Sequence, residues 1–157
     1  MKGRIIIVAL LAAVGLAVAL PLAIGAGGER SRALFGYMNG KKEVDSEGKK
    51  NTGDRNGLGT FSAVVDSGQL CYGITVRDLD DPVAAHIHRG GPNVAGPVVI
   101  PLTQPSAGDP GASSACVEVA DSLLNEMLKR PNRFYVNVHT GPFPNGAVRS
   151  QLKVQKR

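Results

Sequence analysis

Three histidines are the residues whose type and spacing are best suited to chemistry, and the chain has no others. His86 and His88 stand two residues apart in one apolar segment, and His139 lies near the end of another, residues 133–140. If both segments are β-strands, His86 and His88 share one face, with Cβ atoms roughly 6.5–7 Å apart. Neutral imidazoles at that spacing can bind one metal ion through nitrogens about 2.0–2.1 Å away. The pattern predicts a metal site to which all three histidines contribute.

Strand alternation places these histidines on the side away from the core. The residues predicted to face the core are Ala85, Ile87, Val136 and Val138. Tyr135, Asn137 and His139 then share the outer face of the second strand. We expect Asn137 to orient an imidazole through a hydrogen bond and Tyr135 to pack against a covering loop. Two loops rich in glycine and proline, residues 89–97 and 141–146, are expected to fold over the histidines.

The ligand chemistry narrows the choice of metal. Nitrogen ligands in an oxidising compartment fit copper, with zinc as the alternative, whereas calcium and magnesium prefer oxygen ligands. Three protein ligands leave a coordination position open, which redox chemistry needs. Asp81, in a turn before the first histidine, is a candidate fourth ligand, although its other role is that of a turn residue. The site can also be free of metal, because histidines often serve only as hydrogen-bonding residues.

The N-terminus has the layout of an export signal. Two basic residues precede a long apolar run, and residues 23–25 form a small-x-small cleavage site. Residues 1–26 are therefore predicted to be a signal peptide, or else an uncleaved membrane anchor, because residues 5–26 are long enough to span a bilayer. Either alternative places residues 27–157 outside the cytoplasm, as a secreted, cell-surface or periplasmic domain. In such a compartment the two cysteines, Cys71 and Cys116, are predicted to form a disulfide.

Length and charge argue for one domain that does not bind nucleic acid. The chain has 157 residues, which favours a single domain. Its net charge is +5, but the lysines of residues 41–50 are interleaved with Glu43, Asp45 and Glu47. This interleaving predicts a solvated loop rather than a basic stripe, and aromatic residues for stacking bases are scarce at 4%. No protein partner is indicated, and the oligomeric state stays open, a homo-oligomer included.

The elements that must position the histidines are short strands between turns rich in glycine and proline. Strands are predicted at residues 32–38, 58–65, 69–77, 83–88, 98–102, 114–119, 133–140 and 147–154. One helix is predicted at residues 121–129, capped by Asp121 and ended by Pro131. Many short strands with a single helix predict an all-β fold, an antiparallel Greek-key β-sandwich or barrel.

Four segments resemble the CHRD domain, the repeat first described in chordin. They are AAHIHRGGPNVAGPVV from Ala84, YVNVHT from Tyr135, PNGAVRSQL from Pro144 and, more loosely, LFGYMNGKKEV from Leu34. The likeness spans residues 33–152 and departs from the family at Ser150, where glycine is usual.

The resemblance has implications for the fold and for one more residue. It implies a superoxide-dismutase-like or immunoglobulin-like sandwich, in which His86, His88 and His139 match the recurrent histidines. Arg149 matches a recurrent arginine. That arginine either lies near the metal, where it draws an anion or holds a loop carbonyl, or makes a structural hydrogen bond within its strand.

Two functions follow as hypotheses. The first is an exported metal-binding domain with a mononuclear copper site of His86, His88 and His139, open to redox chemistry such as superoxide dismutation. The dismutase needs a fourth copper histidine, however, and this chain has none left. The second is a non-catalytic extracellular binding or structural module whose histidines bond to the covering loops. Whether the chain is an enzyme stays open at this point.

Overall fold

The computed structural model describes residues 33–155 as an antiparallel β-protein with one short α-helix. Its strands are β1 (Ala33–Asn39), β2 (Leu58–Asp66), β3 (Gln69–Arg77), β4 (Pro82–Arg89), β5 (Val98–Leu102), β6 (Gly111–Glu118), β7 (Phe134–Thr140), β8 (Val148–Gln151) and β9 (Lys153–Val154). The helices are α1 (Asp121–Lys129) and two short 3-10 turns, η1 (Gly40–Lys42) and η2 (Pro131–Arg133). The predicted signal peptide or anchor, residues 1–26, lies outside the described residues. Among residues 33–155, no helix is long and apolar enough to cross a membrane.

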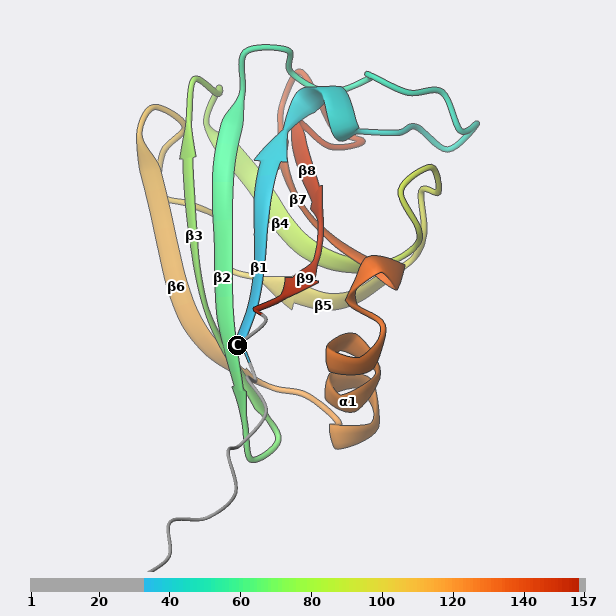
Figure 1. Ribbon diagram of the computed structural model, residues 1–157. Helices are drawn as coiled ribbons and strands as arrows, with labels where there is room; N and C mark the ends of the chain where they lie inside the picture. Colours follow the sequence, from blue (N-terminus) through green and yellow to red (C-terminus); the bar gives the residue numbers. More distant parts are fainter. Residues whose placement is uncertain (1–32, 156–157) are drawn as a thin grey trace, which may run out of the picture.

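The strands form one sheet that bends into a nearly closed barrel (Figure 1). Their order is β5-β4-β7-β8-β1-β2-β3-β6, with β9 paired to β1, and every pairing is antiparallel. The chain crosses between the two halves after β3, β5 and β6, as in Greek-key folds. Near the two edge strands, Thr103 donates a hydrogen bond from its backbone N–H to the Tyr72 hydroxyl, and Ser113 donates one to the Thr103 carbonyl. The predicted all-β fold is confirmed.

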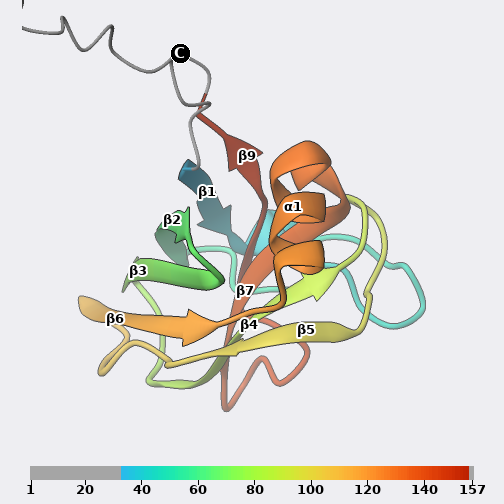
Figure 2. The ribbon, with the colours of Figure 1, turned by 90° about the horizontal axis from the view of Figure 1, so that it is seen from below.

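The core lies between the two halves of the sheet because alternate residues of each strand point inward. Four residues of β3 are buried in this way: Leu70, Tyr72, Ile74 and Val76. The predicted core residues of β4 and β7 are buried as well, namely Ala85, Ile87, Val136 and Val138. Helix α1 adds Leu124 and Met127 to the same core. It covers the end of the barrel away from η1 (Figures 1 and 2).

Three local predictions were wrong. The strand predicted at residues 147–154 begins at Val148 and is interrupted at Leu152, a buried residue whose N–H bonds to the Phe134 carbonyl, so it is divided into β8 and β9. The strand predicted at residues 114–119 is β6 and begins at Gly111. Asp121 does not cap the helix: the Ala120 carbonyl accepts the N–H groups of residues 123 and 124, which makes Ala120 the N-cap. Asp121 is instead the first helical residue, where the helix dipole favours an acidic side chain.

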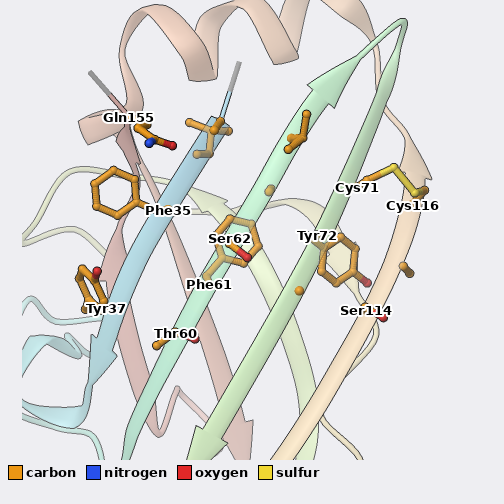
Figure 3. Close-up of a pocket in the computed structure, with 16 residues that line it drawn as sticks. Phe35, Tyr37, Thr60, Phe61, Ser62, Cys71, Tyr72, Ser114, Cys116 and Gln155 are labelled. Atoms are coloured by element: carbon orange, nitrogen blue, oxygen red, sulfur yellow. A yellow bond between two sulfur atoms is a disulfide. The ribbon is translucent and has the colours of Figure 1, made fainter. Parts of the chain in front are cut away.

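The predicted disulfide is confirmed. Cys71 of β3 lies directly opposite Cys116 of β6 and the two sulfurs are bonded. The disulfide borders a cavity of about 880 Å³ on the outer face of strands β1, β2, β3 and β6. Phe35 and Tyr37 lie on the side of this cavity opposite to the disulfide (Figure 3). Among the described residues, the lining of this cavity includes no histidine, acid or base.

Candidate metal centre

The outer face of β4 and β7 carries the three histidines. In the antiparallel register His86 lies opposite Asn137 and His88 lies opposite Tyr135. His139 lies opposite Ala84, one same-face position further along, so it is the diagonal neighbour of His86. Strands β4 and β7 are adjacent in the sheet. The spacing of two within β4 and this register together bring all three imidazoles to one spot.

The distances between the ring nitrogens suit a common ligand. Nδ1 of His86 lies 3.1 Å from Nε2 of His139. One nitrogen from each of the three rings lies within 4.8 Å of the other two. A metal ion bound at 2.0–2.1 Å would hold three such nitrogens about 3.3–3.6 Å apart. Nitrogens that lie up to 4.8 Å apart would have to move closer together for all three to bind one ion.

The covering loops fix which nitrogen of two histidines carries the proton. Nδ1 of His88 lies 2.8 Å from the carbonyl oxygen of Gly96, and Nδ1 of His139 lies 2.9 Å from that of Pro144. A carbonyl can only accept, so in each ring Nδ1–H is the donor and Nε2 keeps its lone pair. Nε2 of His88 is buried and has no hydrogen-bond partner in the described part of the chain. A buried nitrogen lone pair without a partner is uncommon and is the form in which imidazole binds metals.

Glycine at position 96 allows the covering loop to approach the strand. A Cβ at Gly96 would lie 1.7 Å from the carbonyl oxygen of Arg89, so any other residue would force the backbone apart. The N–H of Arg89 bonds to the Pro97 carbonyl, which closes the loop at its base. The Gly96 carbonyl is thereby held at bonding distance from His88. Loop geometry, set by a glycine, orients this imidazole.

Burial keeps the imidazoles neutral. Desolvation, followed by the neighbouring charges of His139 and His88, lowers the pKa of His86 to about 4. Burial is also the chief cause that lowers the pKa of His88 and that of His139, although the bonds to Gly96 and Pro144 raise them in part. All three rings are therefore neutral at pH 7, which is the protonation state that metal binding requires.

Asn137 links the histidines to a buried acid. Its Oδ1 lies 3.1 Å from Nε2 of His139. On its other side the amide interacts with Glu43, a carboxyl group that is only 1% exposed. Desolvation raises the pKa of Glu43 to about 7, against the opposing effects of the Val44 N–H, Arg149 and Asn137. Asn137 thus connects His139, at the candidate metal position, with Glu43, a group that can carry a negative charge.

Tyr135 and Arg149 form the wall beneath the covering loop. The Tyr135 ring stacks on His88 at 4.7 Å between centroids, and the guanidinium carbon of Arg149 lies 3.4 Å from the Tyr135 centroid. Because β4 and β8 flank β7, the tyrosine lies between the two. Nη2 of Arg149 donates to the carbonyls of Gly91 and Val94 in the loop. Nη2 also donates to Oε1 of Gln151 in the same strand, so Arg149 makes both the contacts to loop carbonyls and the hydrogen bond within its strand that were considered for it.

Two sequence-based interpretations need correction. Asp81 is exposed and is not part of the histidine cluster, because five residues of extended chain, roughly 16 Å, separate it from His86. The alternating charges around Glu43 predict a position in a solvated loop, but Glu43 is buried and its Oε1 lies 3.7 Å from Nη1 of Arg149. The signal that could have found it is its place in the opening segment that resembles the CHRD pattern.

Comparison with known proteins identifies the family but adds no relative of known activity. No curated protein matches the chain, and no solved structure matches it. The family model described as the CHRD domain matches residues 36–152. This match includes β4, β7, β8 and the loops that cover the histidines, and it extends over well more than half of the 157 residues. The chain therefore belongs to the CHRD domain family.

Proposed function

We propose that this chain is a metal-binding domain that holds one copper ion through His86, His88 and His139, with zinc as the alternative. The observation that carries the proposal is the buried Nε2 of His88, which has no hydrogen-bond partner among residues 33–155. His139 likewise keeps the lone pair of its Nε2, which lies 3.1 Å from Nδ1 of His86, and all three rings belong to one cluster. Burying an unsatisfied polar atom costs about 1–3 kcal/mol. A bound cation would remove that cost.

The same observation favours metal binding over a purely structural role. A structural module would use the histidines to hold the covering loops, and Nδ1 of His88 and of His139 already does this. The Nε2 atoms are not needed for that task. Nε2 of His139 lies 3.1 Å from Oδ1 of Asn137 and 3.1 Å from Nδ1 of His86, inside the cluster rather than against a covering loop.

Ligand type supports copper or zinc over harder ions. The described cluster consists of nitrogen donors with no carboxylate among them, which disfavours calcium and magnesium. Three protein ligands leave a position for an exogenous molecule. Copper would supply one-electron redox chemistry there, and Glu43 can balance part of the ion's charge through Asn137. Redox turnover, including dismutation of superoxide, belongs to the copper form of this proposal.

The proposed compartment is the cell exterior or the periplasm. The Cys71–Cys116 bridge supports this placement, because disulfides persist in oxidising environments. The export signal expected at residues 1–26 is consistent with it.

Metal content tests the proposal. The full chain is loaded separately with copper and zinc, desalted, and examined by native mass spectrometry. We expect about one ion per chain, absent from the His86→Ala/His88→Ala variant and retained by Asp80→Ala/Asp81→Ala, which removes two exposed carboxylates close by in sequence. At a free metal concentration of 100 times Kd, binding should also stabilise the fold by about 2.7 kcal/mol. Equal metal content in the native chain and the histidine variant would refute the site, as would a native chain that retains no metal and gains no stability.

A further inference from the structure

Four lysines surround a second cavity on the molecule, distinct from the histidine cluster. The cavity measures about 360 Å³, and its lysines are Lys41, Lys42, Lys50 and Lys153. We call this cavity the lysine pocket. Its four lysines come from η1, from the loop after η1 and from β9. Neutral polar side chains of Asn93, Ser150 and Gln151 complete the polar lining, and none of the described residues that line the cavity is acidic.

The fold separates these lysines from the acids that alternate with them in sequence. Glu43 turns into the interior toward Arg149. The Asp45 carboxylate accepts the N–H groups of Glu47 and Lys49 and so closes its own turn. The pairing of Val44 with Lys50 then folds the segment back on itself, which brings Lys50 to the same cavity as η1. A charge pattern that is balanced along the chain becomes a cluster of one sign in space.

The positive charges in the pocket are not neutralised by the described part of the protein. Within residues 33–155, none of the four lysines forms an ion pair. Lys42 donates to the backbone carbonyl of Tyr37, which is neutral. Burial, followed by the charge of Lys153, lowers the pKa of Lys42. Like charges held close together without a counter-charge disfavour the empty pocket, and an anion that contacts several of them would relieve the repulsion.

We propose that the lysine pocket binds a compact ligand that carries several phosphate groups. All four lysines are exposed, so each contact with a single charge is weak in water, and useful affinity requires several contacts at once. Lysine binds phosphate as a point charge. Each phosphate group carries up to two charges, so two or three groups can match four lysines in a cavity of about 360 Å³. Ligands with one charge per carboxylate fit less negative charge into the same space.

The pocket adjoins the loop that covers the histidines but uses other residues. Pro92 and Asn93 of that loop form one side of it, while Arg149 holds the same loop through the Gly91 and Val94 carbonyls. No histidine lines the pocket. Phosphate binding and metal binding can therefore be measured separately, and the failure of one leaves the other intact.

Calorimetric titration of the full chain, kept in nonionic detergent micelles at constant ionic strength, tests the proposal. The probes are sodium tripolyphosphate, pyrophosphate, inorganic phosphate and citrate. We expect affinity to fall in the order tripolyphosphate, pyrophosphate, phosphate, with citrate weaker than tripolyphosphate, and to fall as salt rises. Micelles doped with phosphatidylglycerol form a separate arm, because a lipid headgroup presents the same chemistry on a surface.

Matched variants distinguish a pocket from general charge attraction. Lys42→Gln/Lys153→Gln should weaken tripolyphosphate binding about tenfold. Lys49→Gln/Lys129→Gln removes the same charge from exposed lysines outside the pocket and should change it less than about twofold. Equal losses in the two variants, citrate binding as tight as tripolyphosphate, or binding to the doped micelles alone would each overturn the proposal. Because all the substituted lysines are exposed, both variants should fold, and an unchanged urea midpoint verifies this.

Discussion

Replacing Arg149 by methionine should destabilise the fold by about 4 kcal/mol, within the range for breaking a buried charged pair. Arg149 is 1% exposed, and its Nη2 serves the carbonyls of Gly91 and Val94 and the side chain of Gln151. Each hydrogen bond from a charged group contributes about 1.5–3 kcal/mol, and Nη2 has two hydrogens for these acceptors. Methionine is apolar and unbranched, but it removes the guanidinium that lies over the Tyr135 ring and leaves the acceptors without a donor and Glu43 without its cationic partner.

Urea denaturation of the metal-free, disulfide-bonded chain measures this loss. At pH about 8, where Glu43 is ionised, the free energy of unfolding should fall by about 4 kcal/mol and the melting temperature by roughly 15 °C. The control is Arg77→Met, which removes an ion pair with Asp78 from a side chain that is 63% exposed and should cost less than about 1 kcal/mol. If the two variants differed by less than about 1 kcal/mol, the buried arginine would not hold the loop as described.

Three further changes test other parts of the structure. Gly146→Ala should lower the free energy of unfolding by at least about 2 kcal/mol, because the φ of Gly146 is +128° and a Cβ would lie 2.2 Å from Glu43 Oε2. The control Gly141→Ala should change the free energy of unfolding little, because a Cβ there would meet no described atom within 4 Å. Equal effects of the two substitutions in urea denaturation would contradict this prediction. Glu43→Gln should change the pH dependence of stability. The raised pKa of Glu43 means that the native chain loses stability as pH rises from 4.5 through about 7. The stability of the variant relative to the native chain should therefore increase over this range, by at most about 3 kcal/mol. If the free energies of unfolding of the two chains changed in parallel with pH, Glu43 would not be a buried, titrating group. Reduction of the Cys71–Cys116 bridge, which spans 45 residues of sequence separation, should lower the free energy of unfolding by about 3–4 kcal/mol; an unchanged urea midpoint after verified reduction would show that the bridge does not constrain the unfolded chain.

The sequence predicts the faces of the strands well because their period is simple. A spacing of two determines which side chains share a face, and the apolar partners Val136 and Val138 identify the core side. The histidines could thus be assigned to one outer surface without knowledge of the strand order. That β4 and β7 are neighbours is a long-range fact, and no local pattern states it. The resemblance of the segments to one family supplied that information indirectly.

Charge patterning predicted less, because it does not reveal which side chains turn inward. Glu43 alternates with lysines and so has the pattern of a surface residue, yet Arg149, more than a hundred positions later, provides a buried partner. The charge pattern does not predict the lysine pocket either, because its fourth lysine, Lys153, comes from β9, far along the sequence. The local sequence also does not predict the interruption of the last strand at Leu152, because this interruption depends on a hydrogen bond to the distant Phe134 carbonyl.

The proposed site requires three imidazoles to share one metal ion, and X-ray absorption at the metal edge measures that number of ligands. The full chain is loaded with one equivalent of copper or zinc, and the ligands are counted from the imidazole scattering pattern. The structure predicts three imidazole nitrogens at about 2.0–2.1 Å, reduced to two in His139→Ala. A shell of oxygen donors, or a count that the His139→Ala substitution leaves unchanged, would contradict the three-histidine site.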